Sequence, residues 1–366
     1  MSATQSEAEI AILLSLISEK PDLDVLINSA TLKAVQRSAS RHGMAPLVAY
    51  AIRAHLPELE RAWCDRVLAQ SCSSYHRSLC DLESVAATLG RRGIQILPLK
   101  GPLLASRYYD PPFLRMPSGD LDFGVRECEV EVACSALSEV GYSPDSPLET
   151  ARAFSHHVVM HHPARVSLEL HFRLTHGLRG LPLDPFFDQA APSRLPNGTE
   201  VLTLEGANEI LHLALHAACG RFRPFFHLYE LRRICKVSRP EILRQAGAIA
   251  AESHFAGAFA LLEAAFQSCW GEALLPRDVS MPRTWLGWRI NQRLYQRCSR
   301  WSELDGAHNM RSRLTGRWLD LQATDSPIDA VKQIAMLTEY AWHQLGRRGW
   351  RDVPLGNKPH ASKRSA

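Results

Sequence analysis

The sequence predicts an α+β fold in which a small β-sheet core is flanked by N-terminal and C-terminal helical segments. Before residue 90 and after residue 204, apolar residues recur every three to four positions, as they do on helices. Between these segments lie short apolar or alternating runs bounded by Gly and Pro, which are typical of strands. We therefore expect an N-terminal helical segment over 1–90, a core over 91–203, a C-terminal helical domain over 204–353 and a disordered basic tail over 354–366.

The composition is that of a globular protein with a substantial core, because 46% of the 366 residues are hydrophobic and 22% are charged. The 42 Lys and Arg residues nearly balance the 38 Asp and Glu residues, so charge does not indicate a nucleic-acid partner, although one is not excluded. The nine cysteines form no Cys-x-x-Cys pair, which is typical of reduced thiols. The sequence shows neither a signal peptide nor an apolar run near the ~20 residues that span a bilayer. We expect a cytoplasmic protein with no membrane partner.

The N-terminal segment is predicted to be helical throughout. Ser6 and Glu9 have the spacing of a capping box at the start of an apolar stripe. Residues 30–55 have helical character, and the periodic run over 57–89 predicts one long helix.

The core is predicted to contain strands and helices in alternation. The expected strands are 94–99, 121–125 and a hairpin of 157–162 with 165–173, and the expected helices are 101–109 and 127–141. Residues 177–203 lack a clear period and are expected to form a connection with a turn at 196–198. Further helices are expected at 205–220, 224–237, 240–269, 282–300 and 328–344.

An acid pair carries the strongest chemical signal. Asp120 and Asp122 are separated by one residue on a predicted strand, so both side chains point to the same face. Two like charges that close favour a cation between them. Glu169 lies on the polar face of a second strand, and three carboxylates on adjacent strands suit Mg²⁺ ions that bridge the phosphates of a nucleotide. The alternative is a strand end with solvated acids.

The junction Lys100-Gly101 follows the first predicted strand and precedes a helix that begins with Pro102. A glycine there lets the backbone approach a phosphate, and Lys100 can pair with phosphate oxygens. Arg115 precedes the acid pair. It either holds a phosphate or pairs with an acid at the end of the sheet.

The histidines allow a different hypothesis, a zinc hydrolase, because five of them gather at 156, 157, 161, 162 and 171. Their spacing does not match a zinc motif. His171 is expected on the same face as Glu169, where it either contacts substrate or hydrogen-bonds a carboxylate. Further along, His216 and Arg223 are candidate substrate contacts, although His216 together with His212 fits core packing better.

These residues together resemble a known family. Leu-Lys-Gly at 99–101, Tyr-Tyr at 108–109, Arg115, Gly-Asp-Leu-Asp-Phe-Gly-Val at 119–125 and Leu-Glu-Leu-His-Phe-Arg-Leu at 168–174 are similar to bacterial nucleotidyltransferase family proteins of the DNA polymerase β-like superfamily. The resemblance covers residues 80–235. It implies a mixed sheet with helices on one side, Mg²⁺ on Asp120 and Asp122, and phosphates near Lys100 and Gly101. It makes Glu169 either the third metal ligand or a general base for the acceptor hydroxyl. One departure is Gly101-Pro102, where the superfamily usually has Gly-Ser.

The expected function is therefore transfer of a nucleoside monophosphate from an NTP, with ATP favoured, to a hydroxyl of an acceptor that is a small molecule, a peptide or protein, or an RNA. The expected cofactor is Mg²⁺ or Mn²⁺. The alternative is a catalytically inactive nucleotide- or peptide-binding module with the same fold, which the missing serine hydroxyl after Gly101 would permit.

Overall fold

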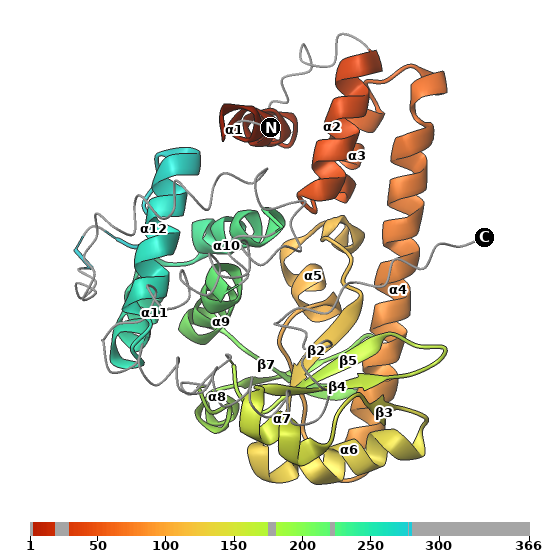
Figure 1. The fold of residues 1–366 in the computed structure, drawn as a ribbon, viewed down its shortest axis with the longest axis vertical. Helices are drawn as coiled ribbons and strands as arrows, with labels where there is room; N and C mark the ends of the chain where they lie inside the picture. The colour runs from red at the N-terminus through yellow and green to blue at the C-terminus, as the bar shows by residue number, and fades with distance from the viewer. Residues whose placement is uncertain (1–2, 19–28, 175–180, 220–223, 277, 280–366) are drawn as a thin grey trace, which may run out of the picture.

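The computed structural model describes residues 3–18, 29–174, 181–219, 224–276 and 278–279 (Figure 1). The predicted helices at 282–300 and 328–344 and the predicted tail at 354–366 lie outside the described residues. None of the helices within the described ranges has the length and apolar character needed to cross a membrane.

The fold is α+β, as predicted. A five-stranded mixed sheet has the order β1-β2-β5-β4-β3, and a separate two-stranded sheet pairs β6 with β7. The strands are β1 (Leu97–Pro98), β2 (Asp120–Gly124), β3 (Ser143–Pro144), β4 (His157–His161), β5 (Ser167–His171), β6 (Ala191–Arg194) and β7 (Glu200–Thr203). The neighbours β2 and β5 are parallel, and the other pairs are antiparallel.

Helices precede, connect and follow the strands. They are α1 (Ala3–Leu16), α2 (Ser29–Arg41), α3 (Ala45–Arg53), α4 (Ala62–Gly90), α5 (Pro102–Tyr108), α6 (Val130–Glu139), α7 (Leu148–Phe154), α8 (Asp184–Asp188), α9 (Gly206–Cys219), α10 (Phe226–Val237), α11 (Pro240–Glu252) and α12 (Ala256–Trp270). The long helix predicted over 57–89 is α4, which runs along one side of the molecule from the N-terminal helices to the sheet (Figure 1).

The two faces of the sheet differ because side chains alternate along its strands. One face is apolar, and it packs with the C-terminal half of α4 and with α6 in one buried cluster that includes Leu121, Phe123, Leu168 and Leu170. The opposite face carries Asp122, Glu169 and His171. In Figure 1, α6 lies below the sheet, whereas α5 and α9 lie above it.

A second buried cluster joins the helical segments on either side of the core. It contains Leu13 of α1, Val48 of α3, Leu211 of α9 and Phe259 of α12. The N-terminal and C-terminal helices therefore share apolar packing. The domain boundaries expected near residues 90 and 203 stay a prediction.

Two expectations about local structure were wrong. Residues 177–203 were expected to be a connection, but the described part contains α8 and the β6–β7 hairpin, with its turn at the expected 196–198. The hairpin is stabilised by a distant contact, because Leu202 N–H donates to Ile96 C=O beside β1 at 2.9 Å. The single helix expected over 240–269 is divided into α11 and α12. His254 adopts a φ of 63°, and Phe255 N–H bonds back to Ala250 C=O at 2.7 Å, which closes α11. The core also contains β3 and α7, for which the sequence offered no expectation.

Gly43 fixes the approach of the N-terminal helices to the rest of the fold. Its φ is +70°, and a Cβ there would lie 3.1 Å from Phe226 Cβ and in contact with Met116 Sδ. Beside it, Phe226 N–H donates to His42 C=O at 3.0 Å. The glycine thus allows the chain between α2 and α3 to lie directly against α10.

Gly43→Ala should lower the free energy of unfolding by about 2 kcal/mol or more, because the left-handed conformation alone costs a side chain about 1–3 kcal/mol. Gly90→Ala is the control. Gly90 is the last residue of α4, and an added Cβ there would have no atom within 4 Å. Gly90→Ala should therefore change the free energy of unfolding by less than about 1 kcal/mol. Urea unfolding measures both, and equal effects of the two substitutions would contradict the account.

Candidate active site

The acidic residues meet on the polar face of the sheet because β2 and β5 are parallel neighbours. Asp122 is directly opposite Glu169, and Asp120 is opposite Ser167. His171 is opposite Gly124 at the end of the pair. The alternation predicted for both strands is confirmed, and it puts Asp122, Glu169 and His171 on one face.

Asp122 is the most deeply buried of the three carboxylates, with 5% of its surface exposed. Lys100 Nζ lies 2.9 Å from its Oδ1, and His171 Nε2 lies 3.2 Å from the same atom. Burial by itself would raise the pKa of Asp122, but the Lys100 ammonium and the hydrogen bond from His171 hold that pKa well below its usual range. Asp122 is therefore a buried, fully charged carboxylate.

His171 links the two carboxylates. Its Nε2 lies 3.4 Å from Glu169 Oε2 as well as close to Asp122, and His157 Nδ1 lies 3.7 Å from the same Glu169 oxygen. Burial would lower the pKa of His171, and the hydrogen bonds to both carboxylates raise it. Burial would raise the pKa of Glu169, and the hydrogen bond from His171 lowers it. Of the two alternatives considered for His171, the hydrogen bond to a carboxylate is the arrangement observed.

Asp120 occupies a different position from the other two acids. Its Oδ1 accepts a hydrogen bond from Ser118 Oγ. Burial and the charge of Asp122 raise the pKa of Asp120. Among the described residues, one ligand atom each of Asp122, Glu169 and His171 lie within 4.8 Å of one another, and Asp120 does not join this group. Carboxylate oxygens suit Mg²⁺ or Mn²⁺, so the donor chemistry of the acids fits the expected ion.

The Lys100-Gly101 junction is held beside these acids by the start of α5. Gly101 has φ 77° and ψ −140°, a conformation essentially confined to glycine, and Pro102 begins the helix. Arg107 anchors the other end of α5. Its Nη1 donates to Leu204 C=O at 2.9 Å and to Glu209 Oε1 at 2.7 Å. The helix is thereby tied to the start of α9, which keeps Lys100 over β2.

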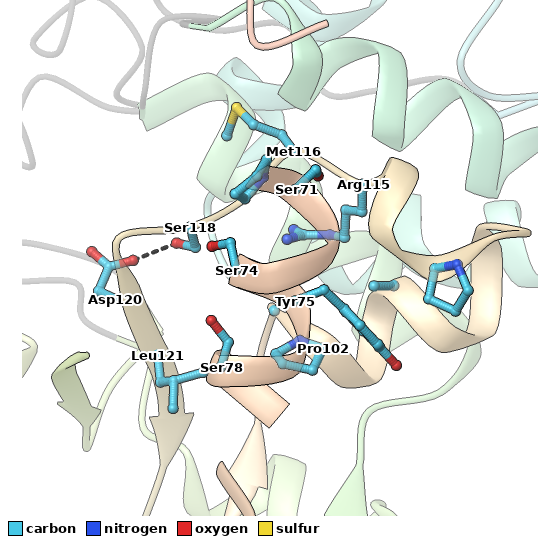
Figure 2. A pocket seen from close by; sticks show the side chains of 14 residues that line it. Ser71, Ser74, Tyr75, Ser78, Pro102, Arg115, Met116, Ser118, Asp120 and Leu121 are labelled. Carbon is cyan, nitrogen blue, oxygen red and sulfur yellow. Dashed lines mark hydrogen bonds between the residues drawn. The ribbon is translucent and has the colours of Figure 1, made fainter. Parts of the chain in front are cut away.

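A pocket opens beside Asp120 (Figure 2). One wall is the face of α4, and the opposite wall is the junction at Gly101 with the loop that leads into β2. Figure 2 shows the hydroxyls of Ser74 and Ser78 on the side of α4 that faces Asp120 and Ser118. The lining residues are Ser71, Ser74, Tyr75, Ser78, Gly101, Pro102, Ala105, Pro112, Arg115, Met116, Pro117, Ser118, Asp120 and Leu121.

His216, a predicted substrate contact, lies against Lys100. Its Nδ1 is 3.3 Å from Lys100 Nζ, and its ring packs edge-on against His227 at 4.5 Å between centroids. Burial first, and then the charge of Lys100, lower the pKa of His216 well below its usual value. A neutral His216 accepts a hydrogen bond from Lys100 and so orients the ammonium. The other predicted contact, Arg223, lies outside the described residues.

Arg115 pairs with an acid, the structural alternative of its two expected roles. Its Nε and Nη2 donate to Glu230 of α10 at 2.7 and 3.0 Å, and both side chains are at least 95% buried. Tyr109 Oη adds a third hydrogen bond to Glu230 Oε1 at 3.3 Å. The pair joins the loop before β2 to the C-terminal helices and so holds one wall of the pocket.

Sequence reasoning missed two parts of the site. Glu230 was not assigned as the partner of Arg115, because the two are 115 positions apart and no local pattern joins them. The hydroxyl face of α4 was also missed. A signal was present, since Ser71, Ser74, Tyr75 and Ser78 have the i, i+3, i+4, i+7 spacing of one helix face.

Glu230→Gln should destabilise the fold by about 3–5 kcal/mol, because it leaves the Arg115 guanidinium buried without a balancing charge. The double variant Arg115→Met/Glu230→Leu should lose much less than the sum of the losses in the single variants Arg115→Met and Glu230→Leu. The exposed pair Arg53–Asp65 is the control, and breaking it should cost less than about 1 kcal/mol. Denaturant unfolding measures the cycle, and strictly additive effects would refute the coupling.

A comparison with known protein families finds a match to the region that contains this site. The model of a family described as uncharacterised nucleotidyltransferases matches residues 28–267, about two thirds of the chain. The match runs from α2 into α12 and includes every residue of the site described above. No curated protein matches the chain. Because the matched region contains the sheet, the acids and the pocket, we conclude that the chain belongs to this family of uncharacterised nucleotidyltransferases.

Proposed function

We propose that the protein transfers a nucleoside monophosphate from an NTP, with ATP as the first donor to test, to a hydroxyl of an acceptor. The acceptor oxygen forms a bond to the α-phosphorus, the bond from that phosphorus to the bridging oxygen breaks, and pyrophosphate leaves. The hydroxyl proton passes to a carboxylate of the site. The family membership supports the reaction class, and the site supports the assignment of residues below.

One observation carries the proposal: Asp122 of β2 and Glu169 of β5 lie opposite each other on parallel strands. Asp120 is two residues before Asp122 on β2, so its side chain is on the same face. Asp120, Asp122 and Glu169 would hold Mg²⁺ or Mn²⁺. When bound, such an ion neutralises phosphate charge and acts as a Lewis acid at phosphoryl oxygens. His171, which lies between Asp122 and Glu169, keeps both carboxylates oriented.

On the donor side, we assign phosphate contact to Lys100 and Gly101. Gly101 presents backbone without a Cβ, so a phosphate could approach it closely. The Lys100 ammonium lies between Asp122 and the neutral His216, from which it could pair with a phosphate oxygen. Arg115 donates hydrogen bonds from Nε and Nη2 to Glu230, so only its Nη1 could contact a phosphate.

On the acceptor side, we assign the pocket beside Asp120. The hydroxyls of Ser74 and Ser78 line it, and they have no hydrogen-bond partner within the described structure. Asp120 is the carboxylate on its wall, where it could take up the acceptor proton. A small molecule, a peptide or an RNA end with a free hydroxyl could enter.

A cytoplasmic location stays a prediction.

A non-catalytic nucleotide- or peptide-binding module is the second candidate, and two observations favour it. Pro102 begins α5 where the superfamily resemblance calls for a serine hydroxyl, and Lys100 Nζ already balances the charge of Asp122. A protein of this kind would bind NTP without releasing pyrophosphate.

Asp120→Asn and Asp122→Asn should each lower NTP-dependent modification of an acceptor at least about 100-fold, because each removes a charge that the transition state requires. The assay incubates labelled NTPs with panels of hydroxyl-bearing small molecules, peptides and RNAs, and follows pyrophosphate release and product mass. Glu131→Gln, at an exposed acid of α6, is the control and should keep full activity. Unchanged turnover in the two Asp variants would reject the assignment, and wild-type NTP binding without any turnover would favour the module.

Ser74→Ala/Ser78→Ala should raise the KM for the acceptor about 3- to 10-fold per lost hydrogen bond while the KM for the NTP stays within about 2-fold. Ser73→Ala, an exposed serine on the other side of α4, is the matched control and should change neither. An increase in the KM for the NTP alone would assign the pocket to the donor instead.

A further inference from the structure

Beside the carboxylates, three imidazoles meet in a cluster, of which the proposed reaction uses only His171, to orient Asp122 and Glu169. One ring nitrogen from each of His156, His157 and His171 lies within 4.8 Å of the others. The ring centroids of His156 and His157 are 4.2 Å apart, and His171 is 5.0 Å from each. His157 and His171 are cross-strand partners of β4 and β5, so the sheet itself holds these two rings together.

The backbone also turns the third ring toward the other two. His156 precedes β4, and its carbonyl accepts hydrogen bonds from Phe172 N–H at 3.0 Å and Arg173 N–H at 3.2 Å. This fixes the chain just before the strand, where neighbouring side chains need not point to opposite faces. The cluster is therefore built on strand pairing and not on a loop.

The spacing of the donor atoms matches a tetrahedral transition-metal site. Bonds of about 2.0–2.1 Å from Zn²⁺ to nitrogen place neighbouring ligand atoms about 3.3 Å apart. His156 Nε2 lies 3.2 Å from His157 Nδ1, and Glu169 Oε2 lies 3.7 Å from His157 Nδ1. The ring nitrogens of His156 and His157 and the Glu169 carboxylate thus lie at about the separations that such an ion requires, and a ring nitrogen of His171 lies within 4.8 Å of the other two imidazoles.

His171 has a nitrogen available for a metal. Its Nε2 faces Asp122 and Glu169, whereas its Nδ1 is buried and has no hydrogen-bond partner in the part of the chain that the structure describes. In the neutral ring with its hydrogen on Nε2, the lone pair is on Nδ1. A histidine that donates one N–H to a carboxylate and binds a metal with its other nitrogen is the usual arrangement in metalloproteins.

We propose that His156, His157 and His171, with Glu169 at the edge, hold one transition-metal ion of the Zn²⁺ type, at a site next to the carboxylates assigned to Mg²⁺. Imidazole-rich ligand sets select Zn²⁺, Co²⁺ or Ni²⁺ over Mg²⁺, which prefers oxygen. His157 is the most exposed of the three imidazoles, with 14% of its side chain exposed, so an ion can enter from its side. The ion would hold β4 against β5 and fix the position of Glu169.

The test needs neither nucleotide nor acceptor, so it is separate from the test of the nucleotidyltransferase. The full chain is stripped with a chelator and titrated with Co²⁺, whose visible absorption is intense in tetrahedral sites and weak in octahedral ones. We expect one equivalent of Co²⁺ with a tetrahedral spectrum, displaced by Zn²⁺ and unaffected by millimolar Mg²⁺. Absence of this band, or its removal by Mg²⁺, would overturn the proposal.

His157→Ala and His157→Gln should weaken Co²⁺ binding at least about 100-fold, the upper end of the loss seen when groups that merely support a ligand are removed. His161→Ala is the matched control, because His161 is an exposed histidine of the same strand that bonds Ser167 instead. Asp120→Asn should bind Co²⁺ normally even where catalysis is lost. Circular dichroism of the metal-free variants confirms folding, and an unchanged Co²⁺ affinity in folded His157 variants would refute the site.

Discussion

The buried charge of Asp122 is the constraint on which the arrangement of the site depends. A carboxylate removed from water is tolerated only with charged or hydrogen-bonding partners. Lys100 supplies one from the junction between β1 and α5, and His171 supplies the other from β5. Asp122 and these two partners belong to three separate segments, so the charge is balanced only when β1, β2 and β5 are in register. The same arrangement brings Glu169 within reach of the site.

This constraint also explains why helices are tied to the sheet so firmly around the site. Lys100 can reach Asp122 only if α5 is fixed, and Arg107 fixes it through Leu204 and Glu209. The Arg115–Glu230 pair does the same for the loop that enters β2. Arg115, a candidate phosphate contact in the sequence, thus holds one wall of the pocket, and the proposed catalytic roles are left to the acids and Lys100.

Much of the site could be predicted because it follows from local geometry. Because side chains alternate along a strand, the sequence predicted that Asp120 and Asp122 share one face of their strand and that Glu169 and His171 share one face of theirs. The Gly101-Pro102 pair predicted the start of α5. The sequence suggested adjacent strands for the acids but not the parallel pairing of β2 with β5, since nothing in either strand specifies its neighbour. Contacts between residues that are distant in sequence could not be predicted. They are the ion pairs of Glu230 with Arg115 and of Lys100 with Asp122, and the position of the α4 serines in the wall of the pocket. The separation of α11 from α12 escaped prediction because a histidine, His254, takes the left-handed conformation usually left to glycine.

The central claim is that Asp120, Asp122 and Glu169 bind the metal that holds an NTP. The most direct measurement is a crystal structure of the protein with Mg²⁺ and a non-hydrolysable NTP. The account predicts an ion between these carboxylates, the phosphates against Gly101 and Lys100 Nζ moved from Asp122 to a phosphate oxygen. A structure in which the nucleotide lies elsewhere, with Lys100 still 2.9 Å from Asp122 and no ion on the carboxylates, would contradict it.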